Sequence, residues 1–285
     1  MSDIDPKWLE ANFKELIDIK PLNSGGQKLV FSATHPIDGE VVLKIILPHQ
    51  KDEAIAREMS AVEQVQSERV PRILESGKAS TPIGDCFWFR EERILGETVR
   101  ECLIKRGLLS TKSLLRLGLH TLEALVNAEQ VNIVHRDVKP ENIICANDGS
   151  YWLIDFGIAR HLELYSLTET SDFFGKFTFG YAPPEQFRNL KRDIDTRSDL
   201  FALGVTLYEC ATGINPFRYN AVSSLEMLRK VETVPLPRLS LSFSTADSFG
   251  DLVTTMTQKR RDHRPSSAHE ALIWMQEICL KEQVH

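Results

Sequence analysis

Cysteines are few in this sequence, and none stands at the spacing of a metal site. The 285 residues include five cysteines, an odd number spread widely along the chain. That number and spacing exclude the dense disulfide framework that holds small secreted domains together. We therefore expect free thiols, a reducing compartment and a cytoplasmic protein.

Long apolar runs and an excess of basic charge are also missing. No stretch approaches the ~20 apolar residues of a membrane span, and the first residues carry frequent charges, unlike a signal peptide. The net charge is −6, so we expect neither a nucleic-acid partner nor a membrane partner. Two short basic clusters, residues 191–192 and 259–261, are predicted to be solvated surface.

Strand signals gather in the first third of the chain. The run 29–47 reads as two strands joined at Asp38-Gly39, a hairpin signal, and the run 85–95 reads as a further strand. Residues 6–17 have roughly helical apolar spacing, from which we predict a helix over about 6–12. The run 53–65 has one apolar stripe and predicts a second helix.

Helical signals dominate after Gly96. The run 110–130 has one apolar face, and Ser110 is a good residue to begin it. A hairpin is predicted over 143–154, and the chain reads as helical from Ser198, with Gly213 at the end of that helix.

This order of elements indicates an α+β fold of two lobes. Because strands come early and helices late, we expect a small strand-rich lobe over residues 1–95 and a larger helical lobe over 96–285.

The segment "NIVHRDVKPENII", residues 132–144, places polar side chains between apolar ends. Asn142 and Asp155 stand at the two ends of the predicted hairpin, so their side chains can converge, and two hard oxygen ligands suit Mg²⁺. Asp137 can face the same point, as a base or as a group that orients a hydroxyl. Lys139 adds positive charge where phosphate charge would develop. The segment therefore predicts the floor of a cleft that binds phosphates and a metal.

"HRDVKPEN" and "DFG" resemble the catalytic loop and the metal-binding loop of eukaryotic-like (Hanks-type) protein kinases. The likeness runs from about Ile19 to Ile278. It implies the bilobal protein-kinase fold and an ATP-dependent serine/threonine protein kinase that transfers the γ-phosphoryl group to protein hydroxyls. The cofactors it implies are ATP and Mg²⁺, with Mn²⁺ as a possible substitute, and the partner is a protein substrate of unknown identity.

The resemblance also assigns roles to residues at the motif positions. The catalytic roles fall to Lys44, Glu58, Asp137 and Lys139. The metal roles fall to Asn142 and Asp155. The structural roles fall to His135, Phe156, Glu185, Asp199 and Arg264. Within these sets, Glu58 would pair with Lys44, His135 would pack on Phe156, Asp199 would brace the catalytic loop, and Arg264 would pair with Glu185.

The phosphate loop, residues 22–30, departs from the family pattern G-x-G-x-x-G-x-V. Asn23 stands at the first glycine, a residue type that tolerates positive φ, and Lys28 stands at the third. Lys28 could meet a phosphate, but the sequence favours an exposed strand lysine. The hinge is expected near 92–96, with Glu91 as an unusual gatekeeper. The predicted nucleotide-binding residues are Asn23, Gly25, Gly26, Val30, Val42, Lys44, Glu92, Ile94 and Ile144.

The activation segment lies between Asp155 and Glu185. Because kinases with an arginine at the position of Arg136 often pair it with a phosphorylated residue, we predict autophosphorylation in this segment. The candidates are Thr168, Thr170 and Ser171, and a homodimer would serve autophosphorylation in trans. The alternative is a solvated loop without modification. Thr178 resembles the threonine that contacts Lys139 and Asp137.

Two other functions stay open. A pseudokinase-like, nucleotide-binding scaffold would fit the altered glycine loop and the unusual hinge, but the residues that the chemistry needs are intact. A small-molecule kinase would lack the peptide-binding segment that "APPE" and Arg264 resemble. Lys139, two residues after Asp137, favours serine or threonine over tyrosine as the acceptor.

Overall fold

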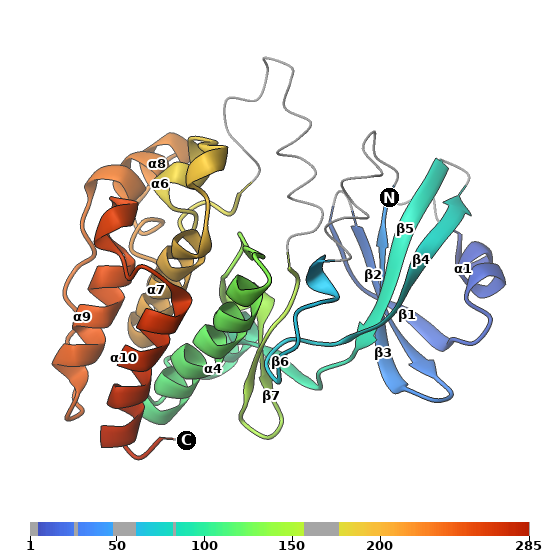
Figure 1. Cartoon of the computed structure of the whole chain (residues 1–285), viewed down its shortest axis with the longest axis horizontal. Helices are drawn as coiled ribbons and strands as arrows, with labels where there is room; N and C mark the ends of the chain where they lie inside the picture. The colour runs from blue at the N-terminus through green and yellow to red at the C-terminus, as the bar shows by residue number, and fades with distance from the viewer. Residues whose placement is uncertain (1–4, 26–27, 48–60, 82–83, 157–176, 285) are drawn as a thin grey trace.

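The computed structural model describes residues 5–25, 28–47, 61–81, 84–156 and 177–284. A β-sheet with one helix lies at one end of the molecule and a group of helices at the other, and a short chain segment joins them (Figure 1). The predicted lobe division at residues 95 and 96 stays a prediction. In the structure the first sheet ends at Glu92 and the next strand begins at Gly96.

The first sheet is antiparallel, with the strand order β1-β2-β3-β5-β4. Its strands are β1 (Ile17–Gly25), β2 (Lys28–His35), β3 (Gly39–Ile46), β4 (Ile73–Thr81) and β5 (Gly84–Glu92). The predicted hairpin at Asp38-Gly39 is confirmed, since His35 pairs with Gly39 across the turn. Gly39 has a φ of 71°, which glycine adopts without strain.

Strand alternation divides the residues of this sheet between two faces. Val41, Leu43 and Ile45 are fully buried on the first face, which packs against the helix α1 (Pro6–Asn12). Val42 and Lys44 belong to the second face, which is turned toward the rest of the chain. The first face therefore stabilises the sheet, and the second is free to carry a site.

The N-terminal helix matches its predicted range, and the apolar spacing beyond it belongs to another element. Asp5 caps α1 by accepting a hydrogen bond from the Lys7 amide. Phe13 is buried against the ring of Trp88, with centroids 5.0 Å apart. Ile17 is 58% exposed and begins β1, so its place in the helical pattern was fortuitous.

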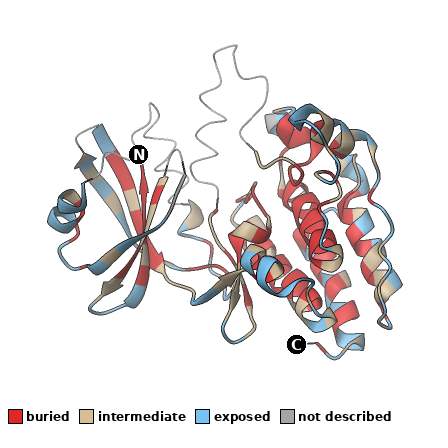
Figure 2. Cartoon of the chain, turned by 180° about the vertical axis from the view of Figure 1, so that it is seen from behind, coloured by how far each residue is buried: buried red, intermediate tan, exposed pale blue. Residues whose placement is uncertain are grey.

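The larger lobe is built around the helix α7, which is buried on almost all sides (Figure 2). Its helices are α3 (Val99–Arg106), α4 (Thr111–Gln130), α7 (Thr196–Thr212), α8 (Ser224–Thr233), α9 (Ala246–Met256) and α10 (Ala268–Lys281). The helix α4 packs against both α7 and α10. Ser110 caps α4, and Gly213 ends α7 with a φ of 75°, as the sequence predicted.

A small sheet joins this lobe to the catalytic loop. Its strands are β6 (Gly96–Thr98), β7 (Ile143–Ala146) and β8 (Tyr151–Leu153), in the order β6-β7-β8. The strands β7 and β8 form the predicted hairpin, and the turn contains Gly149 with a φ of 81°. The other short helical segments among the described residues are η1 (Pro140–Asn142), α6 (Pro184–Phe187), η2 (Lys191–Asp193) and η3 (Arg261–His263).

Some elements were missed or lie outside the described residues. The strand β4 was not predicted, because its residues include Gly77, Lys78 and two serines, and no central-strand pattern marks it. The helix α3 was also missed, although Thr98 and Glu101 form a capping box at its start. Most of the helix predicted over 53–65 lies outside the described residues. Within the described part of the chain, no helix has the length and apolarity needed to span a bilayer.

Candidate active site

The two predicted metal ligands lie at the joined ends of the β7–β8 hairpin. Asn142 ends η1 just before β7, and Asp155 follows β8 by two residues. The Ile154 amide donates a hydrogen bond of 2.9 Å to the Asn142 carbonyl. This backbone bond holds the two ends of the hairpin together. The convergence of the two side chains on a cation stays a prediction.

Asp137 is buried at the centre of a polar cluster. Its carboxylate accepts hydrogen bonds from the Thr178 hydroxyl at 2.7 Å and from the Asn142 amide nitrogen at 2.9 Å. Lys139 Nζ lies 2.7 Å from the Asp137 carboxylate and 2.9 Å from the Thr178 hydroxyl. The predicted contact of Thr178 with Lys139 and Asp137 is therefore present. A carboxylate held beside an ammonium group can accept a hydroxyl hydrogen bond at a fixed position.

A residue of the helix α7 holds the backbone of the catalytic loop in place. Asp199, buried near the start of α7, accepts hydrogen bonds of 2.7 Å from the backbone amides of His135 and Arg136. Burial raises the pKa of Asp199 to about 7, while the two amide hydrogen bonds oppose that rise. Arg136 has a φ of 65°, a conformation that the two bonds help to hold. This is the predicted contact of Asp199 with the loop.

His135 uses both of its ring nitrogens for structure. Nε2 donates to the Ile154 carbonyl at 2.9 Å, and Nδ1 accepts from the Asp137 amide at 3.2 Å. The ring also packs edge-on against Phe156, with centroids 4.7 Å apart, as predicted. These contacts fit a neutral imidazole that positions the loop, and they leave neither nitrogen to move a proton.

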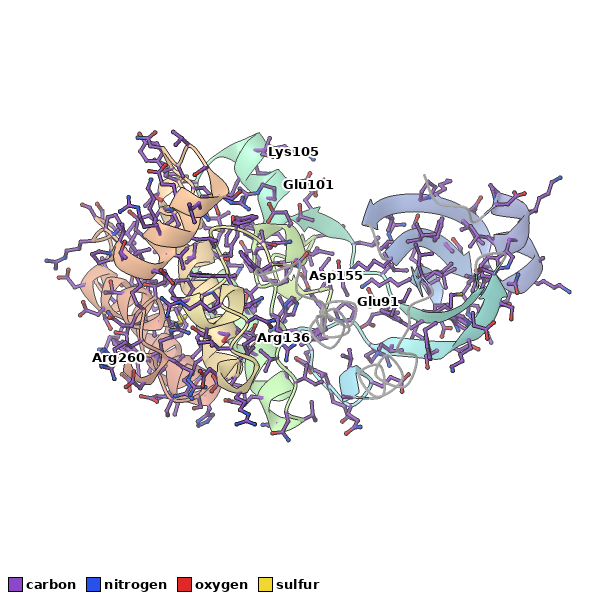
Figure 3. All side chains as sticks on the ribbon, turned by 90° about the horizontal axis from the view of Figure 1, so that it is seen from above. Glu91, Glu101, Lys105, Arg136, Asp155 and Arg260 are labelled. Atoms are coloured by element: carbon purple, nitrogen blue, oxygen red, sulfur yellow. The ribbon has the colours of Figure 1, made fainter. Side chains whose placement is uncertain are left out.

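Lys44 lies in a buried cluster of opposite charges, between Glu91 of the sheet and Asp155 of the loop after β8. Figure 3 labels Glu91 and Asp155, which lie near each other between the two parts of the molecule. The ammonium group of Lys44 forms ion pairs with Glu91 and, at 2.8 Å, with Asp155. Burial alone would lower the pKa of Lys44, but Asp155 and Glu91 hold it above its usual value. The predicted partner, Glu58, lies outside the described residues. The role of Glu91 as a partner of Lys44 was not predicted.

Lys28 belongs to the same cluster. Its ammonium group lies 2.7 Å from Asp155, and its side chain is only 30% exposed. The prediction of an exposed strand lysine is therefore wrong, because the ion pair with the Asp155 carboxylate holds this side chain against the loop after β8. Burial alone would raise the pKa of Asp155, but Lys44 and Lys28 hold it below its usual range. The carboxylate therefore stays ionised, which is the form that could bind a metal.

The donor set fits a hard divalent cation. Both hydrogen bonds that the Asn142 side chain donates, to the Asp137 carbonyl and carboxylate, come from its Nδ2. The amide oxygen, which a cation would bind, lies on the other side of the group. In the described ranges no three His, Cys, Asp or Glu side chains gather as a metal-ligand set. Two protein oxygens would suit Mg²⁺, which retains waters and shares the phosphates of a nucleotide.

The predicted adenine-binding residues are half-buried and come from both sheets. Val30, Val42 and Ile144 come from β2, β3 and β7. Asn23 lies in β1 opposite Val30, and its side chain is outside the described part, as is Gly26; Gly25 ends β1. Glu92 ends β5, and Ile94 follows in the connection to β6. The nucleotide contacts of these residues, and the hinge, stay predictions.

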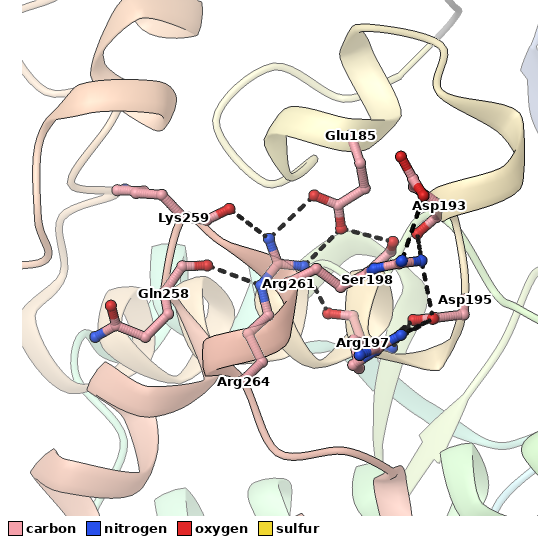
Figure 4. Close-up of polar contacts among 9 residues, drawn as sticks. All are labelled: Glu185, Asp193, Asp195, Arg197, Ser198, Gln258, Lys259, Arg261 and Arg264. Atoms are coloured by element: carbon pink, nitrogen blue, oxygen red, sulfur yellow. Dashed lines mark hydrogen bonds and ion pairs between the residues drawn. The ribbon is translucent and has the colours of Figure 1, made fainter.

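Glu185, at the end of the activation segment, and Arg264 form a buried ion pair (Figure 4). Their atoms lie 2.6 and 3.0 Å apart in a two-pronged contact, as predicted. Ser198, on α7, also donates to Glu185 at 2.9 Å, a contact that no motif indicated. The pair therefore joins the end of the activation segment to α7 and to the segment before α10.

The basic cluster 259–261 is largely not solvated surface. Lys259 Nζ is buried 4.2 Å from the centre of the Phe217 ring, and burial lowers the pKa of Lys259 to about 7. Arg261 donates to the Asp193 carbonyl at 2.8 Å (Figure 4). Arg260 alone is exposed. The prediction was wrong for the other two residues because their partners are distant in sequence.

The candidate regulatory residues are only partly described. The carbonyl of Arg136 accepts a hydrogen bond of 2.8 Å from Gln186, which follows Glu185 at the end of the activation segment. This bond links the catalytic loop to that segment and was not predicted. Thr168, Thr170 and Ser171 lie outside the described residues.

Comparisons with known proteins agree with this geometry. The family model for the protein kinase domain matches residues 17–276. The chain is 31% identical over 257 residues to the probable serine/threonine-protein kinase PkwA of Thermomonospora curvata, covering 88% of this chain and 32% of PkwA. It is 31% identical over 251 residues to the serine/threonine-protein kinase PknL of Mycobacterium bovis, covering 86% of this chain and 61% of PknL.

A solved structure shows the same fold. The structure of Rad53 1–466 in complex with AMP-PNP has a TM-score of 0.70 to this chain and is 21% identical in sequence. The match covers 95% of this chain and 70% of the Rad53 chain.

Proposed function

The chain belongs to the protein kinase family, and from that premise we propose that it transfers the γ-phosphoryl group of ATP to serine or threonine hydroxyls of a protein. The observation that carries the proposal is the cluster in which Asp137 contacts Lys139, Thr178 and Asn142, with Asp155 across the hairpin. PkwA and PknL, which are named serine/threonine kinases, support the choice of acceptor.

The residues have distinct parts in this proposal. Asn142 and Asp155 would hold Mg²⁺, or Mn²⁺ in its place, and Lys44 would contact the nucleotide phosphates. When bound, the metal–nucleotide complex supplies the phosphoryl group and neutralises its charge. Asp137 orients the acceptor hydroxyl and takes its proton. Lys139 lies beside Asp137 and stabilises negative charge at the acceptor.

The regulatory proposal concerns Arg136. A phosphate on Thr168, Thr170 or Ser171 would pair with Arg136 and order the activation segment, and a transient homodimer would provide the phosphate in trans. Mass spectrometry of active protein tests this proposal. If all three residues are unmodified, the proposal is wrong.

The cellular setting is also a proposal. All five cysteines are free thiols in the structure, which supports a reducing, cytoplasmic compartment. The chain spans 32% of the length of PkwA and 61% of that of PknL. The substrate and partners of the whole protein are therefore not assigned by this domain.

Incubation of purified protein with labelled ATP, Mg²⁺ and a generic basic protein tests the proposed transfer. We expect label on serine and threonine with the wild type and with Asp251→Asn, a surface control on α9, but not with Asp155→Asn. If the wild type binds ATP but labels no protein, the function is that of the pseudokinase-like scaffold. Phosphoamino-acid analysis distinguishes serine and threonine from tyrosine.

A further inference from the structure

The register of the first sheet places Lys28 and Lys44 on the same face. Lys28 pairs with Ile46, and Val30 pairs with Lys44. Because residues directly opposite in an antiparallel pair share a face, and alternate residues along a strand do too, the two lysines are diagonal neighbours. Their common direction therefore follows from the backbone and does not depend on a side-chain rotamer.

The two ammonium groups meet on one carboxylate. Lys28 Nζ lies 2.7 Å from Asp155 Oδ2, and Lys44 Nζ lies 2.8 Å from Asp155 Oδ1. Each oxygen of the predicted metal ligand thus has its own ammonium partner. A cation that bound Asp155 would displace these groups and leave two positive charges beside it.

Glu91 balances the charge of this cluster. It forms an ion pair with Lys44 from the neighbouring strand β5, so Lys28 and Lys44 are matched by Asp155 and Glu91. Lys28 stands where the phosphate-loop pattern has glycine, and Glu91 is the unusual gatekeeper. The structure joins these two atypical residues in one chain of ion pairs, Lys28–Asp155–Lys44–Glu91. The positive charge that Lys28 adds to the site is therefore balanced by the negative charge that Glu91 adds.

We propose that Lys28 is a second phosphate-contacting lysine of the nucleotide site, acting beside Lys44. The inference rests on the proposed use of ATP. The ammonium group of lysine is a compact charge on a flexible stem, so it can leave Asp155 for a phosphate oxygen without movement of the strand. The chain thus replaces part of the glycine loop, which binds phosphate through backbone amides, with a side-chain charge.

Calorimetric titration of the whole chain with ADP and with adenosine tests this inference. Lys28→Gln should weaken ADP binding about tenfold, the effect expected for a charge-assisted hydrogen bond, and change adenosine binding less than twofold. Lys28→Arg, which keeps the charge, should retain most of the ADP affinity. Lys20→Gln, an exposed lysine on β1, is the matched control and should bind both ligands as the wild type does.

The possible outcomes separate this inference from the proposed function. If the wild type binds ADP and Lys28→Gln binds it equally well or more tightly, Lys28 only neutralises Asp155 and the inference is wrong. If the wild type binds neither ligand, the proposed function fails as well. An equal loss of ADP and adenosine binding would indicate a structural defect and would also overturn the inference. If Lys28→Gln does not fold, the comparison of Lys28→Arg with Lys28→Gly takes its place.

Discussion

The catalytic loop and the strand face opposite it assemble their charges in different ways. In the loop, Asp137, Lys139 and Asn142 are close in sequence and contact one another directly. On the strand face, Lys28 and Glu91 come from different strands and meet only through Lys44 and Asp155. The loop is therefore a local arrangement, whereas the strand cluster depends on the register of a whole sheet.

This difference predicts different effects of substitution on the reaction and on the stability of the fold. A substitution in the loop should remove the reaction and leave the fold, because the loop backbone is held independently by Asp199. A substitution in a buried ion pair between elements should weaken the fold itself. The predictions below test this distinction, from the largest expected effect to the smallest.

Asp137→Asn should lower the rate of phosphoryl transfer by about 10²–10⁴-fold, the range for loss of a general base. The amide keeps the shape of the carboxylate but cannot take a proton. Single-turnover kinetics with labelled ATP measure the rate, and ADP titration should give an unchanged affinity. A loss of ADP affinity equal to the loss of rate would contradict the assigned role.

Arg264→Met should lower the free energy of unfolding by about 3–5 kcal/mol, because it leaves the buried Glu185 carboxylate without its charged partner. Urea unfolding followed by fluorescence measures this change. The matched control is Arg260→Met, which removes an exposed arginine paired with Asp262 and should not measurably alter stability. Equal effects of the two substitutions would refute the distinction between buried and exposed pairs.

His120 should make stability depend on pH. Its Nδ1 accepts a hydrogen bond of 3.0 Å from the Tyr151 amide, and burial, with the nearby Arg69 and Arg116, lowers the pKa of His120 to about 4. The unfolded chain binds this proton near pH 6.5. Stability should therefore fall as the pH falls from about 6.5 to about 4, by up to about 3 kcal/mol in total from this residue.

The test for His120 is urea unfolding at several pH values. His120→Gln should lack this part of the decline, whereas His263→Gln, at an exposed histidine, should retain it. The same pH profile for all three proteins would show that His120 does not contribute.

Glu91→Gln should have a smaller effect, about 1–3 kcal/mol of stability, the range for a hydrogen bond to a charged group. Lys44 loses one ionic partner but keeps Asp155. Thermal and urea unfolding measure the change beside Glu10→Gln, an exposed control on α1. A loss as large as that for Arg264→Met would mean that Asp155 does not compensate Lys44.

The sequence allowed us to predict those contacts in which both partners belong to motifs of the kinase family. The bonds of Asp199 to the catalytic loop, the pair Glu185–Arg264 and the packing of His135 on Phe156 all followed from the family resemblance. The cap of α4 and the turn at Gly39 were also predictable, because Ser110 and Gly39 act on their immediate neighbours.

The remaining contacts depend on pairings that no local pattern encodes. Lys28 reads as an ordinary strand lysine until the register of β2 and β3 places it beside Lys44. Glu91 lies in the strand run "CFWFREE". The alternation of side chains along a strand shows which face a residue is on, but it does not show which partner a buried glutamate has. One signal could have linked Lys28 to Glu91. The two residues have opposite charges, and both stand at positions where this family usually has other residue types. The burial of Lys259 depends in the same way on a distant residue, Phe217.

The hydrogen bond between Ile154 and Asn142 has a consequence for the thermodynamics of the cation binding that we propose at Asn142 and Asp155. Because this bond forms when the hairpin folds, the backbone entropy lost in bringing Asn142 and Asp155 together is part of folding and is not lost again on binding. Cation binding should then order little of the backbone. Its affinity would be governed mainly by the exchange of ammonium partners on Asp155, so it should respond more strongly to salt and to charge substitutions than to the stiffness of the chain.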